Sequence, residues 1–200
     1  MPEQERRVVS APVEARASEK AKSLGGYAAR FNSETVIAGL FREIIAPGAF
    51  TDALPVSDVR ALWNHDPNQL PLGRTSAGTL VLAQDGQGLT YEVMLPDTTL
   101  ARDLYASVER GDIKESSFAF TVAKDGDDWA YPKGELPVRT IRTVAELFDV
   151  SPVTYPAYNT TTVSARAAAA AQTDQAVEAQ AERVLAAARL RWAKARSDAA

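Results

Sequence analysis

Short runs of β-branched, aromatic and other apolar residues recur between Leu24 and Thr154, and turn-forming residues separate them. This pattern is typical of β-strands. The predicted strands are LGGYAARF (24–31), VIAGLFREII (36–45), ESSFAFTVA (115–123) and VRTIRTVAELFDVSPVT (138–154). The segments GTLVLAQ (78–84) and LTYEVMLP (89–96) flank the turn sequence DGQG and predict a β-hairpin. The core of the protein is therefore predicted to be mostly β.

Other segments carry the three-to-four-residue spacing of an amphipathic helix. The first covers residues 98–110, where Asp97 can cap the N-terminus and Gly111 can end the helix. Its apolar stripe consists of Leu100, Leu104 and Val108. The second lies in the alanine-rich C-terminal stretch, from about Thr173 to Ala195, and has a thin apolar stripe. We expect that C-terminal helix to be marginal alone, and to dock on a partner or be removed.

These changes of pattern divide the chain into parts. Residues 1–23 are charged and predict an N-terminal arm or edge strand, residues 24–166 form the core domain, and residues 167–200 form the alanine-rich helical tail. With 200 residues and 46% hydrophobic content, the chain can bury one sizeable core but is short for two. We therefore expect an α+β fold that is mostly β, with tails.

Composition argues against several classes of function. The formal net charge of −4 gives no overall positive field that would favour nucleic acid. The chain has no cysteine and one histidine, so disulfides, a cysteine nucleophile and a catalytic zinc site are not expected. The N-terminal sequence lacks the pattern of a secretory signal, and no stretch has the roughly 18 apolar residues that cross a bilayer. We expect a protein of a reducing cytoplasm that uses no metal or cofactor.

His65 is the first candidate for chemistry, because any imidazole reaction in this chain must use it. The residues that alternate onto one side of the extended segment SDVRALWNHDP are Val59, Ala61, Trp63 and His65. The following Asp66 and Pro67 predict a turn, where the imidazole can reach a cleft. Histidine can act as a general base near neutral pH, although a lone histidine can equally be structural.

A serine near this histidine would supply the nucleophile of a hydrolase, because histidine can take the hydroxyl proton. In ESSFAFTVA, Phe118 and Phe120 anchor one face of the predicted strand, and Ser117 points to the other face with Ala119. Ser116 shares the phenylalanine face. The alternation therefore favours Ser117 as the nucleophile. Ser116 stays an alternative, and both can be ordinary strand serines.

The orienting acid of such a site is predicted to be Asp149, which lies inside the apolar run ELFDVSPVT. A carboxylate in that position needs a partner to be tolerated. Glu146 is a competitor, and Asp66 adjoins His65 but more naturally faces solvent. Another interpretation of Asp149 is a charge that protects a sheet edge from aggregation.

Two glycine-containing segments are candidate binding sites for negative charge. Gly73 and Arg74 follow the histidine segment and could present a main-chain N–H or a guanidinium to an oxyanion. The segment DGQG (85–88) is better explained as a hairpin turn than as a phosphate site, because no helix begins directly after it.

Segments of the core resemble the prohead maturation proteases of tailed phages, a family related in fold to the herpesvirus assembly proteases. They are GYAARFNS, FREIIAPGAF, ALWNHDPNQLPLGRT, GDIKESSFAF and LFDVSPVTYPAYNTT, in the family's order within residues 24–166. The resemblance implies a small herpesvirus-protease-like β-barrel flanked by helices. It places His65 on the family's histidine and Ser117 on its serine.

The chain departs from the family pattern around the implied site. Asp149 stands where the family usually has a glutamate, which makes the side chain one methylene shorter. Around the serine, Glu115, Ser116 and Ala119 differ from the family's usual residues. The herpesvirus relatives resemble a Ser-His-His arrangement, which a chain with one histidine cannot build within one subunit. A carboxylate third member, or none, is implied.

The resemblance implies a serine endopeptidase in which Ser117 attacks a peptide carbonyl, His65 transfers the proton and Asp149 orients the imidazole. The implied partners are the phage major capsid protein and scaffold, cleaved inside the assembling prohead in the host cytoplasm. A second copy of the chain is a further expected partner, through autoprocessing or homo-oligomerisation, whereas nucleic acid and membrane are not. The alternative is a non-catalytic capsid-assembly module that binds scaffold, with the alanine-rich helix supplying the contact.

Overall fold

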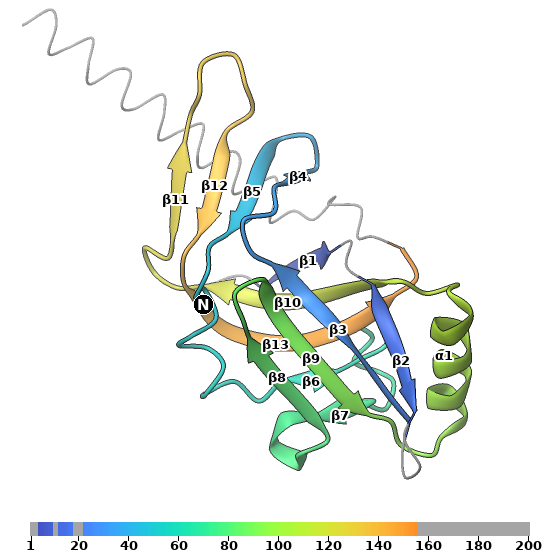
Figure 1. Cartoon of the computed structure of the whole chain (residues 1–200). Helices are drawn as coiled ribbons and strands as arrows, with labels where there is room; N and C mark the ends of the chain where they lie inside the picture. The colour runs from blue at the N-terminus through green and yellow to red at the C-terminus, as the bar shows by residue number, and fades with distance from the viewer. Residues whose placement is uncertain (1–3, 10–11, 18–21, 156–200) are drawn as a thin grey trace, which may run out of the picture. The chain divides into compact units, whose positions relative to one another are not determined.

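The computed structural model describes residues 4–9, 12–17 and 22–155, and within these ranges the strands form three sheets (Figure 1). The β10 sheet has the order β1 (Glu5–Val9), β10 (Glu115–Val122), β13 (Val144–Val153), β6 (Arg60–Ala61) and β7 (Gly73–Arg74). The β5 sheet has the order β11 (Asp127–Ala130), β12 (Val138–Ile141), β5 (Phe41–Ile45) and β4 (Thr35–Ile37). The β3 sheet has the order β2 (Val13–Ala17), β3 (Lys22–Arg30), β9 (Gly88–Met94) and β8 (Leu80–Gln84).

The predicted mostly β core is confirmed, but the predicted barrel flanked by helices is wrong for the described residues. None of these sheets closes on itself, and the described part of the chain contains one α-helix, α1 (Thr99–Arg110), and one short 3-10 helix, η1 (Thr75–Ala77). The chain around β6 and β7 is mostly irregular. Its prolines are Pro47, Pro55, Pro67 and Pro71, and proline cannot donate to a sheet ladder. The predicted C-terminal helix within residues 167–200 lies outside the described residues.

The hydrophobic core joins the β10 sheet to the β3 sheet. Phe118 and Phe120 of β10 stack with ring centroids 4.9 Å apart, and Phe50 meets Phe118 edge to face at 5.7 Å. The largest fully buried side chains are Phe41, Phe50, Phe118, Phe120, Leu24, Ile37, Leu89, Ile141, Leu147, Val59, Val93 and Val144. The core face of β10 is therefore the face that the sequence assigned to its phenylalanines.

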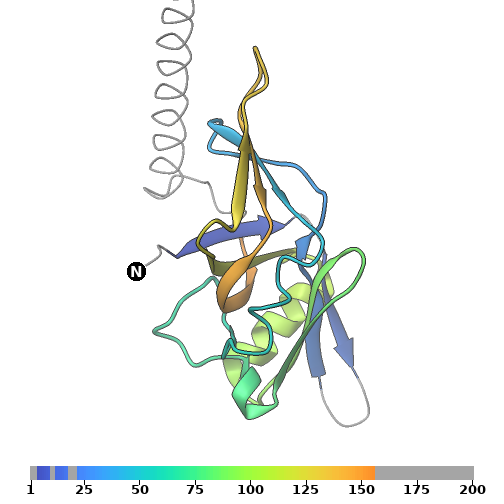
Figure 2. The same ribbon diagram turned by 90° about the vertical axis from the view of Figure 1, so that its left-hand side faces the viewer.

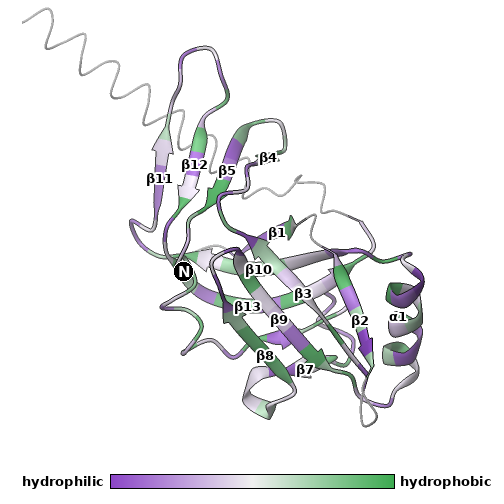
Figure 3. Ribbon diagram, in the orientation of Figure 1, coloured by the Kyte–Doolittle hydropathy of each residue, from purple (hydrophilic) through white to green (hydrophobic). Residues whose placement is uncertain are grey.

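The helix predicted over residues 98–110 is confirmed as α1, and its amphipathic character is visible in Figure 3. Its buried residues are Ala101, Leu104, Tyr105 and Val108. The predicted cap Asp97 is wrong, because the side chain of Thr98 accepts the hydrogen bond from the main-chain N–H of Ala101. Gly111 ends the helix in the left-handed conformation, as predicted. Within the described residues, no helix has the length and apolarity needed to cross a membrane.

The predicted hairpin at DGQG is confirmed, whereas two long predicted strands are each divided. The Asp85 carboxylate accepts hydrogen bonds from the main-chain N–H groups of Gln87 and Gly88, which forms the turn between β8 and β9. A turn with positive φ at Ala38 and Gly39 separates β4 from β5. The predicted strand 138–154 is divided into β12 and β13. The hairpin formed by β11 and β12 extends away from the β3 sheet (Figure 2).

A buried cluster of charges ties the N-terminal strand β1 to the β5 sheet. It consists of Glu5 and Arg7 from β1, Glu43 from β5 and Arg139 from β12, each at most 7% exposed. Arg7 Nη2 lies 2.8 Å from Glu43 Oε2, and Arg139 Nη1 lies 2.7 Å from Glu5 Oε2. Arg139 also pairs with Asp127 of β11 at 2.5 Å. Opposite charges alternate through the cluster, so each buried ion has a partner.

The environment of Glu5 favours its charged form. Burial by itself would raise the pKa of this carboxyl, but hydrogen bonds from Arg139 and the charges of Arg7 and Arg139 outweigh burial and hold the pKa below its ordinary value. Glu43 is the other acidic group of the cluster, and its charge faces Arg7 and Arg139.

We expect Arg139→Met to lower the free energy of unfolding by about 3–5 kcal/mol, because it leaves the two buried carboxylates of Glu5 and Glu43 to share Arg7 as their remaining partner in the cluster. The matched control is Arg142→Met on the loop after β12. Arg142 pairs with Asp128 at a solvent-exposed position, with 66% and 53% of the two side chains exposed, so its loss should cost less than about 1 kcal/mol. Urea denaturation followed by circular dichroism measures both. Similar small losses in the two variants would contradict a structural role for the buried cluster.

The lowered pKa of Glu5 also predicts how stability depends on pH. A carboxyl whose pKa is lower in the folded state contributes stability above its unfolded value, and this contribution is lost as the pH falls through the folded value. We therefore expect Glu5→Gln to be less stable than the wild type at pH about 7, and the difference to shrink towards pH about 3. Glu14→Gln, on the exposed side of β2, should change neutral-pH stability little. A difference that does not vary with pH would contradict the assignment.

Candidate active site

Ser117, His65 and Asp149 meet on the side of the β10 sheet that faces away from the phenylalanine core. Nε2 of His65 lies 2.5 Å from Oγ of Ser117, and Nδ1 of the same ring lies 2.5 Å from Oδ1 of Asp149. Ser117 is 0% exposed, His65 8% and Asp149 4%. The structure thus brings together the serine, histidine and carboxylate that the sequence singled out. Their chemical role stays a prediction at this point.

The alternation of side chains along β10 separates the two candidate serines. Ser117 points towards His65, whereas Ser116 points into the core, where its Oγ lies 2.9 Å from the hydroxyl of Tyr91. Burial raises the pKa of the Tyr91 hydroxyl well above its ordinary value. The hydroxyl of Ser116 is committed to the tyrosine. The geometry therefore favours Ser117, as the sequence did.

Asp149 reaches the site through the regular pairing of β13 with β10, and a β-bulge follows directly beside it. The strand pairs Asp149 with Ala119 of β10 but Leu147 with Phe120, which leaves Phe148 as an extra residue. Asp149 can therefore share the Ser117 face while Leu147 is buried in the core. Without the extra residue, the alternation would put Leu147 on the same face as Asp149.

The competing acids do not face the imidazole. Glu146 pairs with Thr121 of β10 and is exposed at its position on β13. Asp66 instead organises the turn that follows the histidine, because its carboxylate accepts hydrogen bonds from Asn68 and Gln69. These bonds, the main-chain N–H of Asn68 first, hold the pKa of Asp66 below its ordinary value.

The prediction that His65 ends an extended segment is only partly correct. The strand β6 ends at Ala61, and His65 lies in a turn with a left-handed backbone, at φ 56°. Asn64 is also left-handed, at φ 54°, and asparagine adopts this conformation more readily than most residues. The turn is fixed to β13 because the Asn64 N–H donates to Pro152 O at 3.1 Å, and the Thr154 N–H donates to Asn64 Oδ1 at 2.9 Å. Asn64 therefore positions the imidazole.

Ser151 is a site residue that the sequence analysis missed. Its hydroxyl donates to Asp149 Oδ1 at 2.9 Å and lies 3.3 Å from Nδ1 of His65. Ser151 is also the partner of Ser117 in the pairing of β10 with β13. The signal that could have found it is the strand period, because residues two apart on β13 share a face. Ser151 holds the Asp149 carboxylate against the imidazole.

Arg74, a candidate oxyanion donor together with Gly73, is engaged elsewhere. The guanidinium of Arg74 forms a bidentate ion pair with Asp58, and this pairing lowers the pKa of the Asp58 carboxyl. The main-chain N–H of Arg74 donates to Thr79 Oγ1 at 2.9 Å. Gly73 instead allows close packing, because a Cβ there would lie 2.5 Å from a methyl group of Val93. The segment is structural.

The strand β1 covers the edge of β10 at the candidate site. It pairs antiparallel with β10, with Val8 opposite Ser117 and Arg7 opposite Phe118. The hydroxyl of Ser117 donates a hydrogen bond of 2.9 Å to the main-chain oxygen of Arg7. The sequence predicts an arm or edge strand in this region, whereas the burial of its charges could not be predicted, because burial depends on partners far along the chain.

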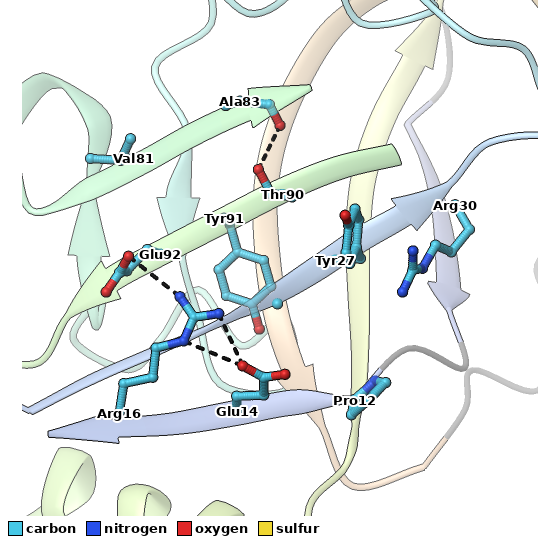
Figure 4. Close-up of a pocket in the computed structure, with 11 residues that line it drawn as sticks. Pro12, Glu14, Arg16, Tyr27, Arg30, Val81, Ala83, Thr90, Tyr91 and Glu92 are labelled. Carbon is cyan, nitrogen blue, oxygen red and sulfur yellow. Dashed lines mark hydrogen bonds and ion pairs between the residues drawn. The ribbon is translucent and has the colours of Figure 1, made fainter. Parts of the chain in front are cut away.

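A cavity of about 420 Å³ lies apart from these residues, on the β3 sheet (Figure 4). Its charged side chains satisfy one another, since Arg16 binds Glu14 at 3.0 Å and Glu92 at 3.5 Å. Tyr91 lines the cavity as well, and its hydroxyl reaches Ser116 on the core side. Within the described ranges, no group of histidine, cysteine, aspartate and glutamate side chains is arranged to hold a metal ion.

Comparison with known proteins gives matches over most of the chain. A family model described as caudovirus prohead serine protease matches residues 10–176. Over 135 residues, which are 66% of this chain, the sequence is 36% identical to the prohead protease of Enterobacteria phage HK97. That match covers 54% of the HK97 protein, so the chain spans about half the length of this relative. The solved structure of the bacteriophage T4 capsid assembly protease aligns with 76% of this chain and 98% of its own, at 10% identity and a TM-score of 0.45.

We expect Asn64→Ala to slow the reaction of Ser117 with a fluorophosphonate by about 10- to 100-fold, because small misplacements of reacting groups have effects of that size. The matched control is Asn68→Ala, in the same loop, which should stay within about twofold of the wild type. Intact-mass spectrometry over time measures both rates, and thermal melting confirms that both variants are folded. Equal rates in the two variants would contradict the positioning role of Asn64.

Proposed function

Because the chain belongs to the caudovirus prohead serine protease family, whose model matches residues 10–176, we propose that it is a serine endopeptidase with a Ser117–His65–Asp149 triad. The observation that carries this proposal is the continuous chain of contacts from Ser117 Oγ through both ring nitrogens of His65 to Asp149, at 2.5 Å for each step. A nucleophile, a base within hydrogen-bonding reach and a third group that orients the base are the parts that serine hydrolysis requires.

The mechanism that follows assigns one role to each side chain. Oγ of Ser117 attacks the carbonyl carbon of the scissile bond while Nε2 of His65 takes the hydroxyl proton. His65 then gives this proton to the leaving amine, and an acyl-enzyme on Ser117 results. Water, deprotonated by the same nitrogen, cleaves the acyl-enzyme and restores the serine. Throughout, the Asp149 carboxylate accepts a hydrogen bond from the Nδ1–H of His65 and stabilises the imidazolium, and the hydroxyl of Ser151 holds the carboxylate in place.

We further propose that the substrates are the phage major capsid protein or scaffold, and that cleavage occurs inside the assembling prohead in the host cytoplasm. The family description and the name of the HK97 relative, a prohead protease, support this assignment. Autoprocessing of the chain or its homo-oligomerisation is a further proposal, and neither nucleic acid nor membrane is a proposed partner. The non-catalytic assembly module stays the alternative function.

We expect Ser117→Ala to abolish cleavage of the major capsid protein encoded by the same phage, because the variant has no nucleophile. The matched control, Ser116→Ala, should retain substantial cleavage, although it loses the hydrogen bond to Tyr91 and about 1 kcal/mol of stability. His65→Ala should also be inactive and folded. Co-expression of each variant with the capsid protein, followed by gel electrophoresis and mass spectrometry, measures the product.

Different outcomes of this experiment separate the alternatives. Loss of cleavage in Ser116→Ala with full activity in Ser117→Ala would move the nucleophile to Ser116. Binding of scaffold without cleavage, by all variants alike, would favour the non-catalytic assembly module. Unfolding of His65→Ala, seen by circular dichroism, would favour a structural role for the histidine.

A further inference from the structure

The proposed nucleophile has no access to a substrate while β1 is in place. Ser117 is 0% exposed, and the edge of β10 next to it is paired with β1 from Glu5 to Val9. A protease must bring a peptide carbonyl to this hydroxyl. In this conformation a main-chain carbonyl is already there, and it belongs to Arg7 of the same chain.

The Arg7 carbonyl also competes with the base for the serine proton. A hydroxyl has one proton to donate, and Ser117 Oγ lies 2.9 Å from Arg7 O and 2.5 Å from His65 Nε2. When the proton goes to Arg7 O, it is not directed to the base. For Ser117 to attack a peptide bond, the carbonyl carbon must lie next to the hydroxyl oxygen, and the carbonyl oxygen must point towards other hydrogen-bond donors. Here the oxygen itself faces the hydroxyl, so β1 is held without being in position for cleavage.

We propose that β1 occupies the substrate cleft. The substrate is an extended peptide that displaces β1, pairs with β10 in its place and carries a basic side chain at the position of Arg7. This inference rests on the proposed function and names the site and class of its substrate. The strand β1 is then a reversible internal competitor. The protease becomes active when β1 leaves and a substrate strand takes over the same edge.

The edge of β10 has the properties of a strand-binding site. The strand β1 is terminal in its sheet, so its departure exposes a row of main-chain N–H and C=O groups on β10. Extended peptides bind such edges by adding a strand, with affinity from the main chain and specificity from pockets for alternate side chains. In the register of β1, the residue at the Arg7 position presents its carbonyl to Ser117.

The surroundings of the Arg7 side chain favour a positive charge. Its guanidinium binds both oxygens of Glu43 and lies 5.6 Å from the centre of the Phe120 ring. Glu43 is 3% exposed and pairs also with Arg139 at 3.1 Å. A cavity of about 420 Å³ beside Arg7 is lined by Glu43 and Glu34 among other residues. When β1 leaves, Glu43 loses one of its two cationic partners, and a substrate lysine or arginine would replace it.

The first experiment loosens β1 in the full-length chain. Arg7→Ala removes one of the two β1 side chains that anchor the strand in the charge cluster. We expect it to raise the rate at which a fluorophosphonate labels Ser117 by about 10-fold, which corresponds to about 1.4 kcal/mol of strand pairing. The matched control is Arg6→Ala, the exposed neighbour on the same strand, which should label at the wild-type rate. Equal rates in Arg7→Ala and the wild type, with both folded by thermal melting, would overturn the proposal.

The second experiment fixes β1 in place and does not depend on weakening it. Arg6 and Ala119 are directly opposite across the strands, at a separation that suits a disulfide. The chain has no other cysteine, so the double variant Arg6→Cys/Ala119→Cys forms one defined crosslink. We expect the oxidised protein to lose labelling of Ser117 and the reductant to restore it. Equal labelling of the oxidised and reduced forms would overturn the proposal.

The third experiment tests the cleft without any chemistry at Ser117. A fluorescein-labelled peptide of residues 1–11 is titrated into the full-length double variant Arg7→Ala/Ser117→Ala, and anisotropy reports binding. We expect this peptide to bind at least about 10-fold more tightly than its Arg7→Glu counterpart, since a desolvated opposite-charge contact is replaced by repulsion. Equal affinities of the two peptides would overturn the proposed preference for a basic side chain. If neither peptide binds, the proposal that β10 forms the substrate cleft is overturned.

These measurements distinguish the further inference from the proposed function. If no form of the protein labels at Ser117 while the peptide binds as expected, the serine protease function fails and the strand-binding cleft is supported. If labelling requires Ser117 and His65 but does not respond to loosening or locking of β1, the protease function is supported and the cleft assignment fails.

Discussion

The candidate site depends on the antiparallel pairing of β10 with β13. This pairing sets Ser117 opposite Ser151 and Ala119 opposite Asp149, so the proposed nucleophile and acid lie on neighbouring strands and on one face. The bulge at Phe148 makes this compatible with a buried Leu147 on the other face. Because β6 also pairs with β13, the turn that carries His65 is fixed to the same strand. A shift of β13 by one residue in this register would turn Asp149 and Ser151 to the face away from Ser117.

The buried charges of β1 illustrate a different kind of constraint. A buried ion pair often adds little net stability relative to a well-packed apolar pair, because both ions lose their hydration. It does, however, distinguish strongly between registers, since a slipped strand would leave its charges buried without partners. Glu5 and Arg7 face Glu43 and Arg139 in one register of β1. That register is the one that sets Val8 opposite Ser117, so the cluster determines which carbonyl lies at the hydroxyl.

Much of the site could be predicted from the sequence because its residues follow local rules. Alternation with Phe118 and Phe120 separated Ser117 from Ser116, and a carboxylate within an apolar run identified Asp149. The structure brings these residues to the single histidine. The left-handed turn of Asn64 and His65, the bulge at Phe148 and the burial of Arg7 could not be predicted, because each depends on contacts with β13 or the β5 sheet. The barrel was implied by the family resemblance and not by strand periodicity, and it was wrong because none of the three sheets of the described residues closes on itself.

The pairing of β1 with β10 has a consequence for the order of folding. The Ser117 hydroxyl and the Arg7 carbonyl are 110 positions apart in the chain, so a ribosome completes β1 long before its partner strand exists. Contacts of such separation close long loops, whose entropy makes them late events in folding. The central strands can therefore form their ladders first, and β1 joins a sheet that is already assembled. An element that folds last at a sheet edge is also an element that can open locally without unfolding the remainder.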